Sequence, residues 1–312
     1  MNFKETFTLT FGDQAENHKG MEIIGEMSNK GFSLDNLLKA KEYFEEKGVT
    51  VEIYHLNKLT KEAKNVDDAY VLVARNGVDG ILGKKGADKM YKEQDLLEKD
   101  TKAYMYGRVV NKNARYNLCF DKESREPNYE AGKGRIVGYD KVQNMFKFKK
   151  ELNNVLSKKL VNNLVVEGNY YYNVDKCYIG FHGDAERRKV IGIRLGKSFK
   201  FHYQWYGLPE EDEDATRKAK AKNEKARVRK TKKLLGKRLE ITLNHGDLYI
   251  MSEKAVGTDW MSQNVLTLRH AAGEVKNLKG INKKKTEGNE CLYSPYKYLL
   301  NDEGYVVVEL ID

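Results

Sequence analysis

Two side chains with metal-binding chemistry stand two positions apart near the middle of the chain. His182 and Asp184 directly follow an alternating segment, Tyr-Ile-Gly-Phe at 178–181, whose pattern predicts a β-strand. Residues two apart in a strand point to the same face, so the imidazole and the carboxylate should project side by side. A pair of this kind would supply two of the three ligands of a 2-His-1-carboxylate iron site, which leaves coordination positions open for a co-substrate and oxygen. A bare His-x-Asp is a weak pattern, so the surrounding sequence has to decide.

The residues on both sides of this pair form two further motifs. Asn169 and Tyr171 make an Asn-x-Tyr motif upstream, and the block around the pair reads Ile-Gly-Phe-His-Gly-Asp-Ala-Glu, ending at Glu186. Over about residues 100–273 this order resembles the AlkB-like family of iron(II)/2-oxoglutarate dioxygenases. The resemblance implies a double-stranded β-helix that uses Fe(II), 2-oxoglutarate and O2. It also implies that Asn169 and Tyr171 hydrogen-bond 2-oxoglutarate, and it makes Glu186 the counterpart of the family's acidic residue.

The third metal ligand does not stand at the family's usual place. The family has its second histidine shortly after an aromatic residue that aligns with Trp260, where this chain has Met261 and Ser262. His270 is the other histidine in this region, which leaves two interpretations: His270 has become the third ligand, or the site has lost one. Strand alternation turns His270 away from its neighbour Arg269, unless a β-bulge rotates it.

A candidate anchor for the co-substrate follows from the segment 266–273, Leu-Thr-Leu-Arg-His-Ala-Ala-Gly. It resembles the final strand of the family, which makes Arg269 the residue that binds a carboxylate of 2-oxoglutarate. A guanidinium suits this role because it can pair with a carboxylate through two hydrogen bonds. A second His-x-Asp, at His245 and Asp247, matches a structural turn of the family and has no Asn-x-Tyr motif upstream, so we do not assign His245 as a ligand.

Cationic and aromatic residues alternate in the segment 104–120, which includes Arg115 and Tyr116. It resembles the nucleotide-recognition segment of the family, although Ala114 replaces the usual proline. Such side chains can hold a phosphate and stack a base. The alternative is an edge strand whose long cationic side chains only lie along the surface. Arg187 adds a basic group beside the metal pair. We expect four residues to contact the substrate: Glu186, Arg187, Arg115 and Tyr116.

The composition favours an acidic partner. The 312 residues include 56 Lys and Arg against 46 Asp and Glu, a net charge of +10. Nucleic acid is the first partner to expect of such a chain, and a solvated lysine-rich surface is the alternative. Three cysteines without Cys-x-x-Cys spacing indicate a reducing compartment. With neither a signal peptide nor a membrane-length apolar run, we expect a soluble intracellular protein of the cytoplasm or nucleus. The oligomeric state is not indicated.

The predicted elements give an α+β fold in three parts. Residues 1–95 read as a small α/β unit of unknown role, with strands at 3–11, 49–56 and 69–74, a helix from near Ala15, and a second helix capped by Ser33 with Asn36 at the capping-box position. Residues 96–275 read as the double-stranded β-helix (jelly roll) with flanking helices, including an amphipathic helix at 142–160, and with a charged insertion at 209–233. Residues 276–312 form a C-terminal extension.

Two functions from different classes follow. The first is an Fe(II)/2-oxoglutarate-dependent dioxygenase that demethylates or hydroxylates a nucleic acid, with a protein substrate as the variant of the same chemistry. The second is a catalytically impaired AlkB-like module that binds nucleic acid after losing a metal ligand.

Overall fold

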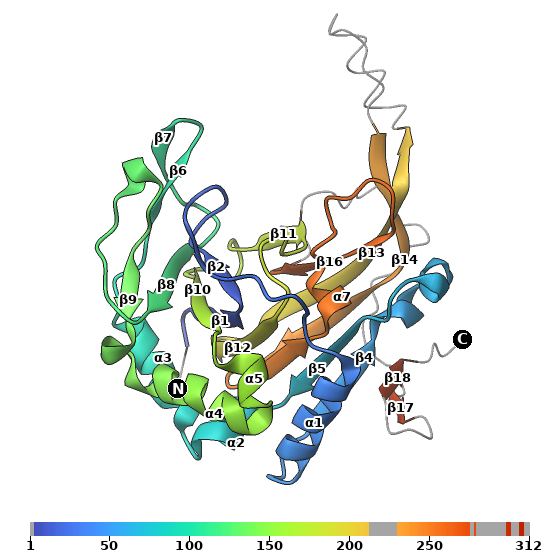
Figure 1. Cartoon of the computed structure of the whole chain (residues 1–312), viewed down its shortest axis with the longest axis horizontal. Coiled ribbons are helices and arrows are strands. Elements are labelled where there is room, and N and C mark those ends of the chain that lie inside the picture. Colours follow the sequence, from blue (N-terminus) through green and yellow to red (C-terminus); the bar gives the residue numbers. More distant parts are fainter. Residues whose placement is uncertain (1–2, 212–229, 275–277, 279–297, 301–305, 309–312) are drawn as a thin grey trace, which may run out of the picture.

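Two large sheets dominate the α+β fold of the computed structural model, which describes residues 3–211, 230–274, 278, 298–300 and 306–308 (Figure 1). The first sheet has ten strands in the order β17-β18-β4-β5-β15-β12-β1-β10-β8-β9. Its neighbours are antiparallel except for the pairs β18–β4 and β8–β9. Its strands are β1 (Thr6–Gly12), β4 (Val51–His55), β5 (Tyr70–Ala74), β8 (Tyr116–Asp121), β9 (Ile136–Gly138), β10 (Val165–Tyr171), β12 (Val190–Gly196), β15 (Leu248–Met251), β17 (Tyr298–Leu300) and β18 (Val306–Val308).

The second sheet has four antiparallel strands in the order β11-β16-β13-β14. They are β11 (Ile179–His182), β16 (Thr267–Ala272), β13 (Phe199–Glu211) and β14 (Lys230–Leu243). Two hairpins stand apart from both sheets, β2 (Gln14–Glu16) with β3 (Ile23–Gly25) and β6 (Lys102–Met105) with β7 (Arg108–Asn111).

Helices cover one face of the ten-stranded sheet, and the four-stranded sheet covers the other. The alternation of β1 shows the division: Phe7, Leu9 and Phe11 pack among the helices, so Thr6, Thr8 and Thr10 face the second sheet. The space between the sheets is filled by a second apolar cluster drawn from both of them. The helices are α1 (Leu34–Glu45), α2 (Gly77–Leu82), α3 (Gly86–Asp95), α4 (Gln143–Val155), α5 (Lys158–Val161) and α7 (Glu253–Val256), with 3-10 turns at Leu56–Leu59, Lys61–Asn65, Tyr129–Ala131 and Tyr139–Lys141.

The N-terminal strand lies in the middle of the large sheet. β1 pairs on one side with β10 and on the other with β12, so that Thr8 stands between Asn169 and Arg194. β5 likewise pairs with β15. The expectation of a separate unit at residues 1–95 was therefore wrong, because these strands complete a sheet whose other members come from the middle and end of the chain.

Local predictions were met where a helix has its own cap or apolar face. Ser33 caps α1, with the full capping box formed by Asn36. The helix predicted at 142–160 is present as α4 and α5. The helix predicted from Ala15 was wrong: the chain forms the β2–β3 hairpin, in which Asp13 accepts hydrogen bonds from the backbone N–H groups of Ser28 and Lys189. This segment has too few apolar residues to bury a helical face.

The ends of the predicted charged insertion belong to strands. β13 runs to Glu211 and β14 begins at Lys230, while 212–229 lie outside the described residues. Most of the predicted extension at 276–312 also lies outside them. Among the described helices, none is both long enough and apolar enough to cross a lipid bilayer.

Candidate metal centre

Two histidines from neighbouring strands face each other between the sheets. In the β11–β16 pair, His182 stands directly opposite His270. Directly paired residues on one face of an antiparallel pair bring their side chains close together. The two imidazole rings lie 4.5 Å apart, centre to centre, and the His270 side chain is buried. The pairing of two strands nearly 90 residues apart in the chain therefore creates the histidine pair.

Asp184 completes a triad. Its Oδ1 lies 3.3 Å from Nε2 of His182 and 3.6 Å from Nε2 of His270. The three side chains offer one ligand atom each, all within 4.8 Å of one another. The backbone N–H of Asp184 donates to the carbonyl oxygen of Val256, which holds the loop after β11 in place. Of the two interpretations open from the sequence, the arrangement corresponds to the one in which His270 is the third donor.

The hydrogen bond on the far side of His182 defines which of its nitrogens is free. Nδ1 lies 2.7 Å from the carbonyl oxygen of Gly180, and a carbonyl can only accept, so Nδ1 carries the proton. In the neutral ring, Nε2 then directs a lone pair toward the carboxylate of Asp184. Two acceptors facing each other need a cation between them or a proton on one of them. Metal-bound histidines show this same bond from the other ring nitrogen to a backbone carbonyl, so the donor set fits a divalent metal ion.

Arg187 keeps the acid of the triad ionised. Its guanidinium is buried, 3.8 Å from Asp184 and 2.6 Å from Glu167, and Glu186 also accepts from it at 2.8 Å. Burial alone would raise the pKa of Asp184, but the Arg187 guanidinium and the His270 imidazole hold it well below its usual range. Burial raises the pKa of Glu186, and the Asp184 carboxylate adds to this in spite of Arg187.

A chain of hydrogen bonds continues from Arg187 to the Asn-x-Tyr motif. Asn169 donates to Glu167 at 3.0 Å, and its Oδ1 accepts from Arg115 and Asn117 at 2.6 Å each. The structure thus brings Arg115, Glu186 and Arg187, which were expected to contact the substrate, together with Asn169, which was expected to bind 2-oxoglutarate. Because both ends of the Asn169 amide are engaged here, this network holds β10 to β8 and to the loop after β11. Tyr116 stacks on Tyr172, with ring centres 4.7 Å apart.

Arg269 does not join the triad, and its expected role as the 2-oxoglutarate anchor needs correction. It stands next to His270 in β16, and strand alternation turns it to the opposite face. Its guanidinium carbon lies 4.1 Å from the centre of the Tyr206 ring and 5.2 Å from Trp260, whose carbonyl oxygen accepts from it at 3.3 Å. The segment 266–273 thus forms β16 of the four-stranded sheet, which carries the candidate ligand His270. It does not belong to the ten-stranded sheet.

Sequence reasoning missed Arg194, which the structure places on the inner face of β12. It is 1% exposed, and its guanidinium carbon lies 5.0 Å from the ring of Phe199 and 5.6 Å from that of Tyr171. The signal was present, because Arg194 is the one charged residue in the otherwise apolar strand Val-Ile-Gly-Ile-Arg-Leu-Gly. Tyr171, the second residue of the Asn-x-Tyr motif, is its neighbour.

Comparison with known proteins gives a relative that matches most of this chain. The chain is 46% identical over 272 residues to "Uncharacterized protein R156" of Acanthamoeba polyphaga mimivirus, a match that covers 86% of this chain and 96% of the viral protein. The chain belongs to the same family as this viral protein. The match spans most of both chains, so membership extends over both sheets and is not confined to one segment. No model of a known protein family matches the chain.

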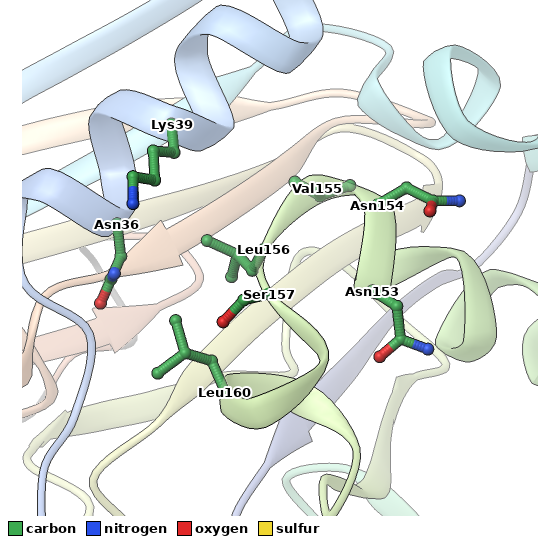
Figure 2. A pocket seen from close by; sticks show the side chains of 8 residues that line it. All are labelled: Asn36, Lys39, Asn153, Asn154, Val155, Leu156, Ser157 and Leu160. Atoms are coloured by element: carbon green, nitrogen blue, oxygen red, sulfur yellow. The ribbon is translucent and has the colours of Figure 1, made fainter.

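Two further histidines, His202 and His245, and a surface pocket do not belong to the triad. His202 contacts the carbonyl oxygen of Gly273 at 2.8 Å, and His245 accepts from the backbone N–H of Gly196 in the second His-x-Asp turn. A pocket of about 300 Å³ opens on the helical side, between α1 and the connection from α4 to α5 (Figure 2). Its lining, which includes Lys39 and Ser157, contains neither an acidic residue nor a histidine.

Proposed function

We propose that the protein is an Fe(II)/2-oxoglutarate-dependent dioxygenase of the AlkB-like type, with His182, Asp184 and His270 as the metal ligands. The observation that carries this proposal is the convergence of two imidazoles and one carboxylate, with the outer nitrogen of His182 bonded to a backbone carbonyl. Two histidines and one carboxylate are the ligand set of non-haem iron oxygenases. When bound, Fe(II) would supply O2 activation coupled to decarboxylation of the 2-oxo acid and oxidation of a substrate C–H bond.

The sheet arrangement supports a double-stranded β-helix around this site. The four neighbouring strands β15-β12-β1-β10 of the large sheet lie opposite the four strands β11-β16-β13-β14. β10, β12 and β15 contribute apolar side chains to the core between the two sheets, as do β4 and β5. Eight strands in two facing sheets is the strand count of a jelly roll. In this chain the N-terminal strand β1 would be one of the eight. The sequence resemblance, which covers about residues 100–273, had not included this strand.

The residues around the triad would prepare it for a divalent ion. Arg187 holds Asp184 as a carboxylate, and the Gly180 carbonyl orients the His182 ring. The alternative function, a module that has lost its third ligand, depended on the lack of a donor near the pair. His270 supplies that donor, so the structure favours the enzyme over the impaired module.

A nucleic acid is the substrate we propose, and the β6–β7 hairpin supports it. Its tip residue Tyr106 is 88% exposed, and Arg108 is exposed beside it. An exposed aromatic ring next to a cation can stack on a base and contact its phosphate. The net charge of +10 points the same way. A base inside a duplex would have to be flipped out to reach a buried metal. A protein substrate would use the same metal site. The comparison of oligonucleotide and peptide substrates described below distinguishes the two.

The test is an anaerobic titration with Fe(II) followed by 2-oxoglutarate, read from the weak visible charge-transfer band of the ternary complex. We expect the band with the wild-type protein and its loss in His182→Ala. His55→Ala is the matched control, because His55 lies near the surface and pairs with Asp68 at 3.0 Å. A band that persists in His182→Ala would refute the assignment of this site.

A second measurement identifies the substrate class. Succinate release is compared with methylated oligonucleotides and with methylated or unmodified peptides as substrates. Stimulation by oligonucleotides alone is the expected result, and stimulation by peptides alone would replace the nucleic acid with a protein substrate.

A further inference from the structure

A buried guanidinium without a counter-ion lies between the two sheets. Arg194 is 1% exposed, and its Nε and Nη1 atoms have no hydrogen-bond partner among the described residues. Its nearest aromatic neighbours, Tyr171 and Phe199, contribute ring faces and no negative charge. An uncompensated buried charge is strongly destabilising, and its hydrogen-bond donors add to the cost when they are unmade. Such a group in a well-packed interior indicates an anion that binds there.

The carboxylate whose charge acts on Arg194, that of Asp247 in the turn before β15, is already engaged. Asp247 accepts hydrogen bonds from Arg75 at 2.8 Å and from the backbone N–H groups of Asn76 and Asn244 at 2.9 Å each. It meets Arg194 only through the backbone, where its carbonyl oxygen accepts from the Arg194 N–H at 2.8 Å. Arg194 therefore lacks the partner that the other buried arginine of the interior, Arg187, has in Glu167.

Arg194 points into the same space between the two sheets as the metal triad. In the registers of β10, β1 and β12, Thr8 lies between Asn169 and Arg194, and all three point toward the four-stranded sheet. The Phe201 ring connects the two regions: its centre is 5.1 Å from that of Tyr249 and 5.9 Å from that of His270. Tyr249 in turn covers Gly192, where a Cβ would overlap its ring. An anion at Arg194 would thus lie in the same interior as the metal ligands.

We propose that Arg194 binds a carboxylate of the 2-oxo diacid co-substrate, with the hydroxyl groups of Tyr171 and Thr8 beside it. The identity of the diacid rests on the proposed function, while the need for a carboxylate rests on the unpartnered guanidinium. A guanidinium offers two parallel donors to a carboxylate and stays charged when buried. The site is built in part by the N-terminal strand, and it replaces Arg269, which faces away from the triad.

The test measures 2-oxoglutarate binding to the Mn(II)-loaded full-length protein by calorimetry. Arg194→Met removes the charge at similar volume, and we expect it to weaken binding about 10- to 100-fold, the loss that goes with a charge-assisted hydrogen bond. Arg269→Met is the matched control and should bind like the wild type. Because the methionine variant no longer buries an unpaired charge, it should fold at least as stably as the wild type. Equal affinity of Arg194→Met and wild type, or a loss confined to Arg269→Met, would overturn the proposal.

Two further probes separate this proposal from the proposed function. 2-Oxobutyrate lacks the distal carboxylate, so the wild type should bind it far more weakly than 2-oxoglutarate, and Arg194→Met should show little discrimination between them. Glutarate, which has two carboxylates and no oxo group, should raise the melting temperature of the metal-free wild type and not that of Arg194→Met. If Mn(II) fails to bind but glutarate still stabilises only the wild type, the dioxygenase fails and the carboxylate site stands. If Mn(II) binds and glutarate stabilises both proteins equally, Arg194 is not the anchor.

Discussion

The Nδ1 atom of His182 lies 2.7 Å from the carbonyl oxygen of Gly180, within the same strand. This bond determines the tautomer of the ring and leaves the lone pair of its other nitrogen directed toward Asp184. If the triad binds a metal ion as proposed, a ring already held in this orientation would lose little conformational entropy on binding. The short loop from His182 to Asp184 carries two of the three donors, so a backbone change there would move both.

Gly183 should tolerate no side chain. A Cβ added there would overlap the backbone oxygen of Gly257, which cannot move as a flexible side chain could. Gly183→Ala should therefore destabilise the protein by about 1–3 kcal/mol and weaken Mn(II) binding, because the loop must shift with its two ligands. Gly180→Ala is the matched control, since nothing lies within 4 Å of its added Cβ. Urea unfolding and calorimetric titration measure both effects, and equal behaviour of the two variants would contradict this account.

His270 should be required for metal binding. His270→Phe keeps an aromatic ring in the core and removes the donor, so we expect Mn(II) affinity to fall by more than the 10- to 100-fold typical of losing an outer-shell partner. His55→Phe should bind Mn(II) like the wild type. Electron paramagnetic resonance of free and bound Mn(II) gives the affinity directly. An unchanged affinity in His270→Phe would mean that another residue is the third ligand.

Arg187 should contribute strongly to stability. Arg187→Met leaves Glu167 and Asp184 without their buried counter-charge, and we expect the free energy of unfolding to fall by about 3–5 kcal/mol. The double variant Arg187→Met with Glu167→Gln should recover part of this loss, because it also removes one of the unpaired carboxylates. Urea unfolding of the single and double variants tests the pair. A single variant as stable as the wild type would show that the network contributes little.

Lys112 should make stability depend on pH in the alkaline range. Burial lowers its pKa from 10.5 to about 8, although the Asp100 carboxylate acts in the opposite direction. Below about pH 8 both the folded and the unfolded chain carry the proton, and the folded state bears the full cost of about 3 kcal/mol. Between pH 8 and 10.5 the unfolded chain binds more protons, so this contribution to stability rises with pH.

The measurement compares the wild type with Lys112→Met, which has no titrating group at this position. Their difference in unfolding free energy should be constant below about pH 8 and should then move in favour of the wild type as the pH approaches 10.5, by up to about 3 kcal/mol. Both proteins contain the same tyrosines and cysteines, so the titration of these groups cancels in the difference between the two unfolding free energies. A difference that stays flat across this range would show that Lys112 titrates normally.

Local rules were sufficient for the features that depend on near neighbours in the chain. The two-residue period of a strand placed His182 and Asp184 on one side, the Ser33 cap began α1, and the apolar stripe at 142–160 gave α4. The same period predicted that His270 and Arg269 could not both face His182 and Asp184, but it did not indicate which of the two would. That choice depended on which face of β16 meets the core, and the face is set by pairing with β11 and β13.

The sequence by itself placed His182 beside Asp184, began α1 at the Ser33 cap and marked β10 with the Asn-x-Tyr motif. Only the tertiary structure decided that His270 completes the triad, that Arg269 turns outward, and that Arg194 lies buried without a counter-ion. It also decided that the N-terminal strand belongs between β10 and β12, whose residues pair with it across more than 150 positions. The physical reason is that hydrogen bonds between strands are nearly the same for any sequence, so partner and register are selected by the packing of whole faces and not by any local signal.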